Sequence, residues 1–398
     1  MNNFVPSVTS AAYDHTRYNT HLIKYKQLSL KFQLVSKICT SSVEVKHCCA
    51  ITTPRLKLTG TWRRNLKLTS GEHPYRLSLN TKQRQAMLHS KIILAGGAGL
   101  VGQNLVAHLK GRGYKNIVVL DKHRTNLDVL RQVQPDITAE YADLAEPGDW
   151  QRHFEDAGAV VMLQAQIGGV VYEDFVRNNV DSTRLILDAI KVNGAPYLVH
   201  ISSSVVTSIA DDFYTNTKKV QEQMVLESGI KCPVLRPTLM FGWFDRKHLG
   251  WLSRFMQRVP VFPIPGNGRF MRQPLFVGDF SNIIISCIEQ TITDGVYNIS
   301  GHENIDYIDM IREIKRATDA RATVVKIPYA LFYTLLWAWS LFDRNPPFTT
   351  QQLEALVAKD EFEVIDWPGI FGVPYTPFKQ AIHETFNDPR YSNVVLEF

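Results

Sequence analysis

Residues 91–113 read KIILAGGAGLVGQNLVAHLKGRG, and this stretch decides the fold. A short apolar strand leads into three regularly spaced glycines, and an amphipathic helix follows them. Gly96 permits the tight turn, Gly99 lets the backbone approach a pyrophosphate, and Gly102 allows the helix to pack closely on the strand. Free N–H groups at the helix N-terminus then face the phosphates. We therefore predict that five residues of this loop bind a dinucleotide: Gly96, Gly99, Leu100, Val101 and Gly102.

The second predicted strand bears on the choice of dinucleotide, because it ends in the acidic residue Asp121. A carboxylate about twenty residues beyond the glycines accepts hydrogen bonds from the adenosine ribose hydroxyls. It also repels a 2′-phosphate, so we expect the cofactor to be NAD. Lys122 and Arg124 lie beside Asp121 and could reverse that preference, which keeps NADP as the alternative.

Beyond Asp121 the pattern alternates between short apolar strands and amphipathic helices. We predict strands at 137–142, 159–164, 197–202 and 233–236, and helices at 126–133, 174–192 and 211–228. Such alternation is typical of a parallel sheet with helices on both faces. We therefore predict an α/β protein with a Rossmann-type doubly wound parallel sheet. The pattern becomes mixed further on, which predicts a cofactor-binding domain at 87–265 interleaved with a smaller C-terminal substrate lobe at 266–398.

Side chains able to do chemistry gather near the fifth predicted strand. Ser202, Ser203 and Ser204 end this strand, where α/β sheets place functional side chains. Tyr214 and Lys218 lie four residues apart at the start of the next predicted helix, so they share one face. An ammonium beside a phenol lowers the pKa of the phenol, which can then act as a base, while a serine hydroxyl polarises the substrate oxygen. The pattern predicts acid–base catalysis at a hydroxyl group.

Together these motifs resemble the extended short-chain dehydrogenases/reductases of the NAD-dependent epimerase/dehydratase family, from residue 90 to about 300. The resemblance rests on GGAGLVG (96–102), Asp121, Asp143-Leu144, NNVDST (178–183), HISSSVV (200–206), YTNTK (214–218), LRPTLMFG (235–242) and GNGRFMRQPLFVGDF (266–280). In that family the tyrosine is the acid/base, the lysine orients the nicotinamide ribose, and the serine binds the reacting oxygen.

The resemblance also implies roles for individual residues. The implied catalytic residues are Ser204, Tyr214, Lys218 and Asn179, with Ser203 as the alternative serine. The resemblance adds Asp143, Leu144 and Lys218 to the cofactor-binding residues predicted above. The implied substrate-binding residues are Ser204, Tyr214 and Arg272. Arg272 falls where members acting on nucleotide-sugars bind a diphosphate. Relatives pair through the two helices with the Asn and Tyr motifs, which implies a homodimer.

A departure from the family pattern bears on the reaction. Sugar 4,6-dehydratases carry an Asp-Glu pair directly after the strand-end serine, and related decarboxylases carry a Glu, whereas this chain has Val205-Val206. Valine cannot move a proton, so elimination and decarboxylation are disfavoured. The predicted reaction is NAD(P)-dependent hydride transfer at a carbinol or ketone carbon of a nucleotide-sugar, as in a 4-epimerase or keto-reductase.

Two alternative functions stay open. Leu239, where nucleotide-sugar members often carry an asparagine, and an apolar run at 327–342 favour a hydroxysteroid-like or other lipophilic-alcohol dehydrogenase. A non-catalytic NAD(P)-binding scaffold, similar to an accessory subunit of respiratory complex I, is the other alternative. The apolar run is shorter than the ~20 residues that span a bilayer. We predict a core or interface helix there, with peripheral membrane contact as the alternative.

The charge of the chain is unevenly distributed. Its 398 residues include 44 Lys+Arg and 38 Asp+Glu, for a net charge of +6. Residues 1–86 hold 14 Lys+Arg against three acidic residues, so residues 87–398 are acidic and give no sign of a nucleic-acid partner. We predict that this leader is disordered or not native, with translation beginning at Met87. A transit peptide and a genuine basic tail are the alternatives.

The cysteines bear on the compartment. There are five, an odd number, and no secretory signal begins the chain, which indicates reduced thiols. We therefore predict a cytoplasmic protein, or a mitochondrial one if the leader is a transit peptide. No Cys/His spacing resembles a zinc site, and we expect no metal. The family resemblance implies a small-molecule substrate.

Overall fold

The computed structural model describes residues 81–194, 196–341, 349–357 and 363–397. The predicted leader lies outside this part of the chain except at 81–86, where helix α2 (Thr81–His89) begins. Met87, the predicted start, lies inside this helix, and its side chain packs against the main hydrophobic core together with Leu88. Tyr114 also donates a hydrogen bond to Met87 Sδ at 3.3 Å. Contacts with the hydrophobic core therefore begin within α2, at Met87 and Leu88.

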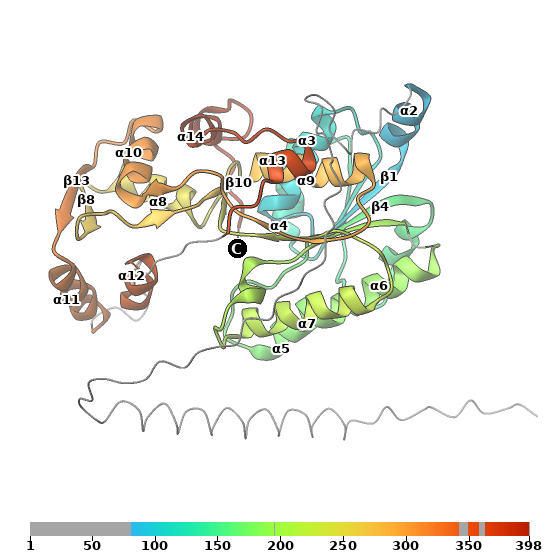
Figure 1. Ribbon diagram of the computed structural model, residues 1–398, viewed down its shortest axis with the longest axis horizontal. Helices are drawn as coiled ribbons and strands as arrows, with labels where there is room; N and C mark the ends of the chain where they lie inside the picture. The colour runs from blue at the N-terminus through green and yellow to red at the C-terminus, as the bar shows by residue number, and fades with distance from the viewer. Residues whose placement is uncertain (1–80, 195, 342–348, 358–362, 398) are drawn as a thin grey trace, which may run out of the picture. The chain divides into compact units, whose positions relative to one another are not determined.

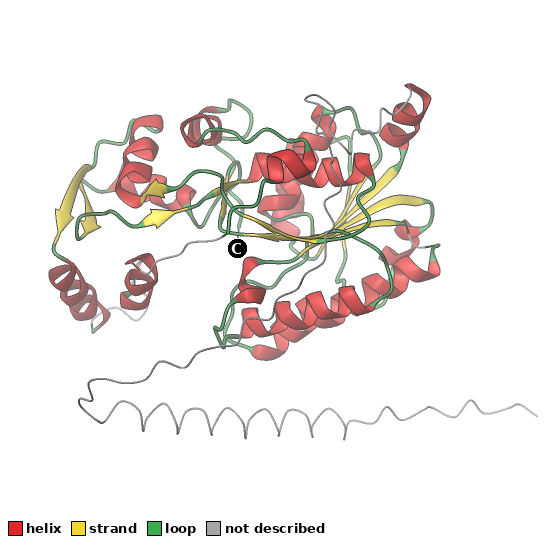
Figure 2. Ribbon diagram, viewed as in Figure 1, coloured by secondary structure: helices red, strands yellow, loops and turns green. Residues whose placement is uncertain are grey.

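A seven-stranded sheet forms the centre of the fold, as Figure 2 shows. Its spatial order is β11-β6-β5-β4-β1-β2-β3, and every strand pair in it is parallel. The strands are β1 (Lys91–Ala95), β2 (Ile117–Asp121), β3 (Thr138–Tyr141), β4 (Ala157–Met162), β5 (Tyr197–Ile201), β6 (Val234–Pro237) and β11 (Val296–Ile299). Strands covered on both faces read as continuous apolar runs, as in KIILA and IVVLD.

Helices cover both faces of this sheet (Figure 1). They are α3 (Leu100–Gly111), α4 (Arg124–Val133) and α9 (Val277–Gln290) on one face, and α6 (Ser182–Val192) and α7 (Phe213–Glu227) on the other. The first group buries Leu105, Leu127 and Ile284 in one core, and the second buries Ile186 and Val225 in another. The architecture is therefore the predicted doubly wound α/β fold.

The C-terminal lobe has its own hydrophobic core. It consists of α8 (Leu249–Arg258), α10 (Tyr307–Ala317) and α14 (Phe378–Asn387), packed on the parallel pair β8 (Val261–Pro265) and β13 (Thr323–Ile327). Met256, Phe262 and Ile311 are buried there. The lobe thus takes α8 and β8 from before residue 266, while the large sheet takes α9 and β11 from after it. The two parts of the chain are interleaved in sequence.

Several further elements are short. The paired strands are β7 (Met240–Phe241) with β10 (Leu275–Phe276), and β9 (Met271–Arg272) with β12 (Ile305–Asp306). The short helical segments are η1 (Asp149–Phe154), α5 (Tyr172–Phe175), the π-helical η2 (Val176–Asp181), the 3-10 helix η3 (Ser204–Thr207), α12 (Thr350–Val357) and α13 (Trp367–Phe371). The predicted helix at 174–192 is therefore interrupted by a π-helical turn.

The apolar run at 327–342 contains helix α11 (Tyr329–Ser340). Phe332 is buried, but Leu335, Trp337 and Trp339 are about half exposed. The helix follows β13, which lies in a two-stranded sheet at the edge of the lobe (Figure 1), and it is mostly exposed, so it is not a core helix. No helix among the described residues is both long enough and apolar enough to cross a bilayer.

Candidate active site

A cavity of about 1490 Å³ lies at the carboxyl ends of the strands in the large sheet. The loops after β1, β2, β4, β5 and β6 line it, together with the segment after β7. Doubly wound sheets bind ligands at this edge, at the point where the strand order reverses. Here the order reverses at β1, which lies between β4 and β2. The cavity therefore has the position at which such a sheet binds a dinucleotide.

The glycine-rich loop forms one wall of the cavity, and its glycines differ in geometry. Gly96 has a φ of +77°, and an added Cβ would lie 2.4 Å from the Cα of Gln164. At Gly102, an added Cβ would lie 2.2 Å from the backbone oxygen of Gly97. Gly99 is the N-cap of α3, and no heavy atom lies within 4 Å of such a Cβ, so the space there is open to a ligand. All five predicted loop residues line the cavity: Gly96, Gly99, Leu100, Val101 and Gly102.

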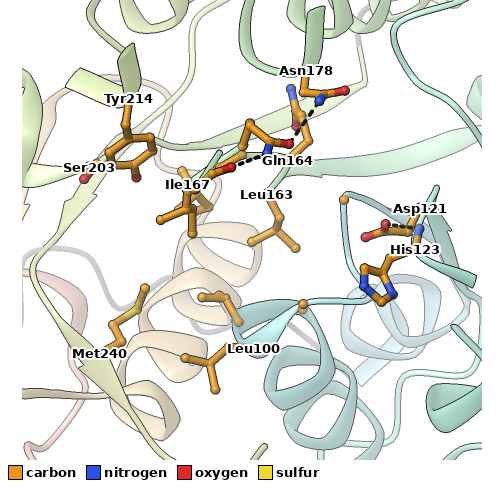
Figure 3. A pocket seen from close by; sticks show the side chains of 18 of the residues that line it. Leu100, Asp121, His123, Leu163, Gln164, Ile167, Asn178, Ser203, Tyr214 and Met240 are labelled. Carbon is orange, nitrogen blue, oxygen red and sulfur yellow. Dashed lines mark hydrogen bonds between the residues drawn. The ribbon is translucent and has the colours of Figure 1, made fainter. Parts of the chain in front are cut away.

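Asp121 ends β2 at the cavity wall (Figure 3). Its carboxylate accepts hydrogen bonds from the backbone N–H groups of Ala98 and His123, both at 2.9 Å. Burial raises the pKa of Asp121, and these backbone hydrogen bonds oppose the shift. Each carboxylate oxygen keeps a further lone pair, so the group can still accept a hydrogen bond from a ligand hydroxyl.

The two cations beside Asp121 are already engaged. Lys122 Nζ donates to Asn178 Oδ1 at 2.6 Å, and the Arg124 guanidinium lies over the Tyr141 ring, 3.7 Å from its centroid. A 2′-phosphate would have to draw at least one of them away, against repulsion from the Asp121 carboxylate. The geometry therefore favours NAD over NADP.

Asp143 and Leu144, which follow β3, also line the cavity. The Asp143 carboxylate accepts the Ala145 backbone N–H at 3.1 Å and pairs with Arg177 at 2.7 Å. Arg177 also forms an ion pair with Glu146, with 2.5 Å between Arg177 Nη2 and Glu146 Oε1. Asp143 therefore fastens the loop after β3 to η2, which fixes the shape of this wall.

Tyr214 lies in the first turn of α7, next to Ser203 (Figure 3). Asp212 caps this helix by accepting the Thr215 backbone N–H at 2.9 Å. Burial raises the pKa of Tyr214, while a side-chain hydrogen bond with Ser203 lowers it. Ser204 also lines the cavity but forms the first residue of η3. The serine that meets Tyr214 is therefore Ser203, the alternative of the two predicted.

Lys218 is fully buried, one turn after Tyr214, and lines the cavity. Its ammonium donates hydrogen bonds to the backbone oxygen of Ile201 at 3.1 Å and to Gln221 Oε1. Burial lowers the pKa of Lys218 to about 7, and the Glu222 carboxylate opposes this shift. An ammonium has three N–H groups, so one remains for a ligand.

Asn179 is fully buried in η2, behind the cavity wall. Its Nδ2 donates to Thr217 Oγ1 at 2.9 Å, and its Oδ1 accepts the Gln166 backbone N–H at 2.6 Å. The amide thereby joins α7 to the loop after β4. Asn179 thus supports the helix that carries Tyr214 and Lys218 instead of contacting the cavity itself.

Arg272 is not among the described residues that line the cavity. From β9, its guanidinium donates a hydrogen bond to the backbone oxygen of Leu356 in α12. The cations that do line the cavity include Arg246 and Lys247, beside His248 in the segment after β7. Burial lowers the pKa of Lys247 to about 8, and Arg246 adds to the shift. A local motif could not place Arg272, because its position depends on how β9 packs on α12.

The end of the chain also lines the cavity, which no sequence pattern predicted. Leu396 and Glu397 belong to the wall, and a β-bridge joins Val395 to the segment after β7. Asn126 fastens this end: its Nδ2 donates to the Glu397 backbone oxygen at 3.0 Å, and its Oδ1 accepts the Glu397 N–H at 2.8 Å. The two residues are 271 positions apart, so no local pattern signals the contact. We call residues 395–397 the C-terminal strap.

Comparisons with known proteins found a matching family model and curated relatives. The model of the NAD dependent epimerase/dehydratase family matches residues 92–300. The chain is 26% identical to NADH dehydrogenase (ubiquinone) 1 alpha subcomplex subunit 9, mitochondrial, of Dictyostelium discoideum, over 65% of this chain and 73% of that protein. It is 21% identical to dTDP-glucose 4,6-dehydratase of Escherichia coli, over 58% of this chain and 76% of that protein.

A solved structure shares the fold. The UDP-glucuronic acid 4-epimerase of Bacillus cereus in complex with NAD superposes with a TM-score of 0.56 at 18% identity, over 74% of this chain and 96% of that chain. This likeness confirms the predicted Rossmann-type fold.

Proposed function

Since the chain belongs to the NAD dependent epimerase/dehydratase family, we propose that it transfers hydride between NAD and a carbinol or ketone carbon of a nucleotide-sugar. NAD is the cofactor of this family, as predicted, and it would supply the nicotinamide carbon that accepts or donates the hydride. The residues present fit this cofactor. Gly99 leaves open space at the N-terminus of α3, where phosphates bind, and Asp121 offers a carboxylate to ribose hydroxyls.

The observation that carries this proposal is the meeting of three side chains at one cavity. Ser203 follows β5, and Tyr214 and Lys218 come from α7. As a phenolate, the Tyr214 oxygen would take the proton of the substrate hydroxyl when the carbon is oxidised. As a neutral phenol, it would donate that proton when the ketone is reduced. Ser203 would stabilise the phenolate through its hydrogen bond, which lowers the pKa of Tyr214. Lys218 lies one turn further along α7 and lines the same cavity.

The residues after Ser203 favour epimerisation or ketone reduction over elimination. Elimination requires a further proton donor and acceptor beside the strand-end serine. With Ser203 as the strand-end serine, the two positions directly after it hold Ser204 and Val205, and both line the cavity. Neither side chain is a carboxylic acid that could exchange a proton near neutral pH, so the proposed reaction is that of a 4-epimerase or a keto-reductase.

Arg246 and Lys247 supply the positive charge that a nucleotide diphosphate requires. Both line the cavity, and Asp245 holds their loop by accepting the backbone N–H groups of His248 and Gly250 at 2.9 and 3.0 Å. Arginine and lysine bind phosphate through charge-assisted hydrogen bonds. The UDP-glucuronic acid 4-epimerase with the same fold is named for a substrate of this class.

A substrate panel tests the proposal. The full-length chain is incubated with NAD and UDP-glucose, UDP-glucuronic acid or dTDP-glucose, products are separated by chromatography, and NADH is followed by absorbance. We expect turnover of at least one sugar and a loss of roughly 100-fold or more in Tyr214→Phe. Tyr375→Phe, at an exposed tyrosine of the lobe, is the matched control. Unchanged turnover in Tyr214→Phe contradicts the catalytic role, and no turnover with any sugar contradicts the substrate class.

A second candidate function is NAD binding without turnover. The 26% identity with the mitochondrial NADH dehydrogenase subunit favours it, as do the half-exposed side chains of Leu335, Trp337 and Trp339 on α11. Calorimetric titration with NAD, run beside the panel, distinguishes the candidates. Binding without turnover of nucleotide-sugars or of lipophilic secondary alcohols supports the scaffold. Turnover of the alcohols alone supports a lipophilic-alcohol dehydrogenase.

A further inference from the structure

A chain of buried amides connects the cavity wall to the Lys218 ammonium. Gln221 is fully buried one turn after Lys218, and its Oε1 accepts a hydrogen bond from the ammonium. Its Nε2 donates to Thr183 Oγ1 at 2.9 Å. Gln164, after β4, donates through Nε2 to the same oxygen at 3.2 Å. Side chains from α7, α6 and the end of β4 thus form one hydrogen-bonded chain.

Thr183 sets the direction of this chain. Its hydroxyl donates to the Asn179 backbone oxygen at 2.7 Å, so it has no second proton to give. Both glutamines must therefore present their NH₂ groups to Thr183, which turns their oxygens away from it. The oxygen of Gln221 meets Lys218, whereas that of Gln164 has no partner among the described residues. Gln164 is 8% exposed and lines the cavity, so this end of the chain lies beside the ligand space.

We propose that Gln221 is a positioning residue that holds the Lys218 ammonium at the end of β5, and that Thr183 and Gln164 hold Gln221 in turn. A buried ammonium needs acceptors, because burial disfavours the charged form unless its N–H groups are hydrogen-bonded. The backbone oxygen of Ile201 supplies one acceptor and Gln221 supplies another. The third N–H is thereby directed to the cavity. The role in catalysis rests on the proposed function, but the contact can be tested without a substrate.

The charged and titratable groups around Lys218 do not replace this acceptor. On α7, Glu222 accepts a hydrogen bond from Arg236 Nε of β6 at 2.9 Å, so its charge is already paired. On β5, His200 is fully buried, and burial, with a smaller effect of Lys218, lowers its pKa well below the usual value, so it carries no charge. Neither of its ring nitrogens has a hydrogen-bond partner among the described residues, so it is not an acceptor for Lys218. Burial raises the pKa of Tyr214, which is also neutral. The α6 and β4 sides present the uncharged amide chain.

Removing the acceptor tests the proposal. Lysines of the full-length chain are labelled with carbon-13 at Cε, the Lys218 resonance is assigned by its loss in Lys218→Met, and its pKa is measured by NMR titration. In Gln221→Met, which keeps the length but lacks the oxygen, we expect this pKa to fall by about one to two units. In Gln221→Glu, which adds a negative charge, we expect it to rise. Gln223→Met makes the same change at an exposed position of α7 and should leave the titration unchanged.

Opposite shifts in the two Gln221 variants support the proposal, and an unchanged Lys218 titration in Gln221→Met overturns it. If Gln221→Met does not fold, Gln221→Asn takes its place, because the shorter amide cannot reach both partners. The same fall is expected, and an unchanged titration again overturns the proposal.

The panel adds a kinetic readout. With a sugar that turns over, the alkaline limb of the kcat profile should move to lower pH in Gln221→Met by the shift seen in the titration. An equal loss of kcat at every pH indicates a merely structural role and overturns the proposal. A panel without turnover contradicts the proposed function, while the titration still decides whether Gln221 holds the ammonium.

Discussion

Replacing Gly99 by alanine should weaken NAD binding without unfolding the protein. Gly99 has a φ of −82°, which alanine adopts without strain, and the added Cβ would meet no heavy atom within 4 Å. As the N-cap of α3 it makes no side-chain hydrogen bond. The free energy of unfolding should therefore change by about 1 kcal/mol or less. The added methyl would nevertheless stand where a pyrophosphate approaches the free N–H groups of α3.

The size of the effect on NAD follows from the hydrogen bonds that are lost. A hydrogen bond to a charged group contributes about 1.5–3 kcal/mol, so losing one N–H to phosphate bond raises the Kd roughly 10- to 150-fold. At an NAD concentration of about 100 times the wild-type Kd, the cofactor adds about 2.7 kcal/mol to the free energy of unfolding. A Kd about 100-fold weaker reduces this to about 0.4 kcal/mol. Most of the NAD-induced rise in Tm should therefore disappear.

Gly102→Ala is the matched control for this experiment. Its added Cβ would lie 2.2 Å from the backbone oxygen of Gly97 and 2.4 Å from the Gly97 Cα, so the start of α3 would have to move. Overpacking of this kind costs about 1–3 kcal/mol, and we expect a lower Tm before any NAD is added. Thermal unfolding with and without NAD, together with calorimetric titration, measures both quantities. Wild-type affinity in Gly99→Ala, or a wild-type Tm in Gly102→Ala, would refute the reasoning.

Three further predictions concern single side chains. Ser203→Ala should lower kcat roughly 10- to 150-fold, since it removes a hydrogen bond to the phenolate. Ser204→Ala should change kcat by about twofold at most. Equal losses in the initial rates of the two variants would contradict the choice of Ser203. Asn126→Ala removes both hydrogen bonds to Glu397 and should speed NADH dissociation severalfold in stopped-flow fluorescence. An unchanged dissociation rate would show that the C-terminal strap does not retain the cofactor. Burial lowers the pKa of His108 to about 4, below the value of about 6.5 in an unfolded chain. The unfolded chain therefore binds this proton first as the pH falls. The folded state keeps its full stability above about pH 6.5 and loses part of it as the pH falls towards 4. The free energy of unfolding should drop by about 2 kcal/mol between about pH 7 and pH 5 through this group, and urea unfolding of His108→Phe should show a smaller drop.

The sheet could be predicted because its strands are short apolar runs between turns. This pattern is local and does not depend on contacts with the C-terminal lobe. The helix predicted at 174–192 shows the limit of such periodicity. It contains a π-helical turn at Val176–Asp181, within a continuous helical segment. This turn places Asn179 for its bonds to Thr217 and to the loop after β4. Those bonds are tertiary, so the apolar pattern of the helix does not record them.

The choice of serine could not be predicted for a different reason. Ser202, Ser203 and Ser204 have the same chemistry, and their roles depend on the residue at which β5 ends. Ser202 donates to Glu222 at 2.5 Å, Ser203 meets Tyr214, and Ser204 begins η3. A shift of one residue exchanges these roles, and element boundaries are what a sequence determines least well. The motif therefore indicates which side chains share the cavity but not which serine meets Tyr214.

The cavity extends beyond the part of the chain that carries the family motifs. The family model ends at residue 300, yet Leu396 and Glu397 line the cavity, and Leu396 packs in one buried cluster with Trp243 and Tyr391. A change near residue 397 can therefore alter cofactor retention while every motif stays intact. A fragment that ended at residue 300 would lack this strap and also α10 and α14 of the lobe core. The fold can thus be inferred from the motifs, but affinity for NAD has to be measured on the whole chain.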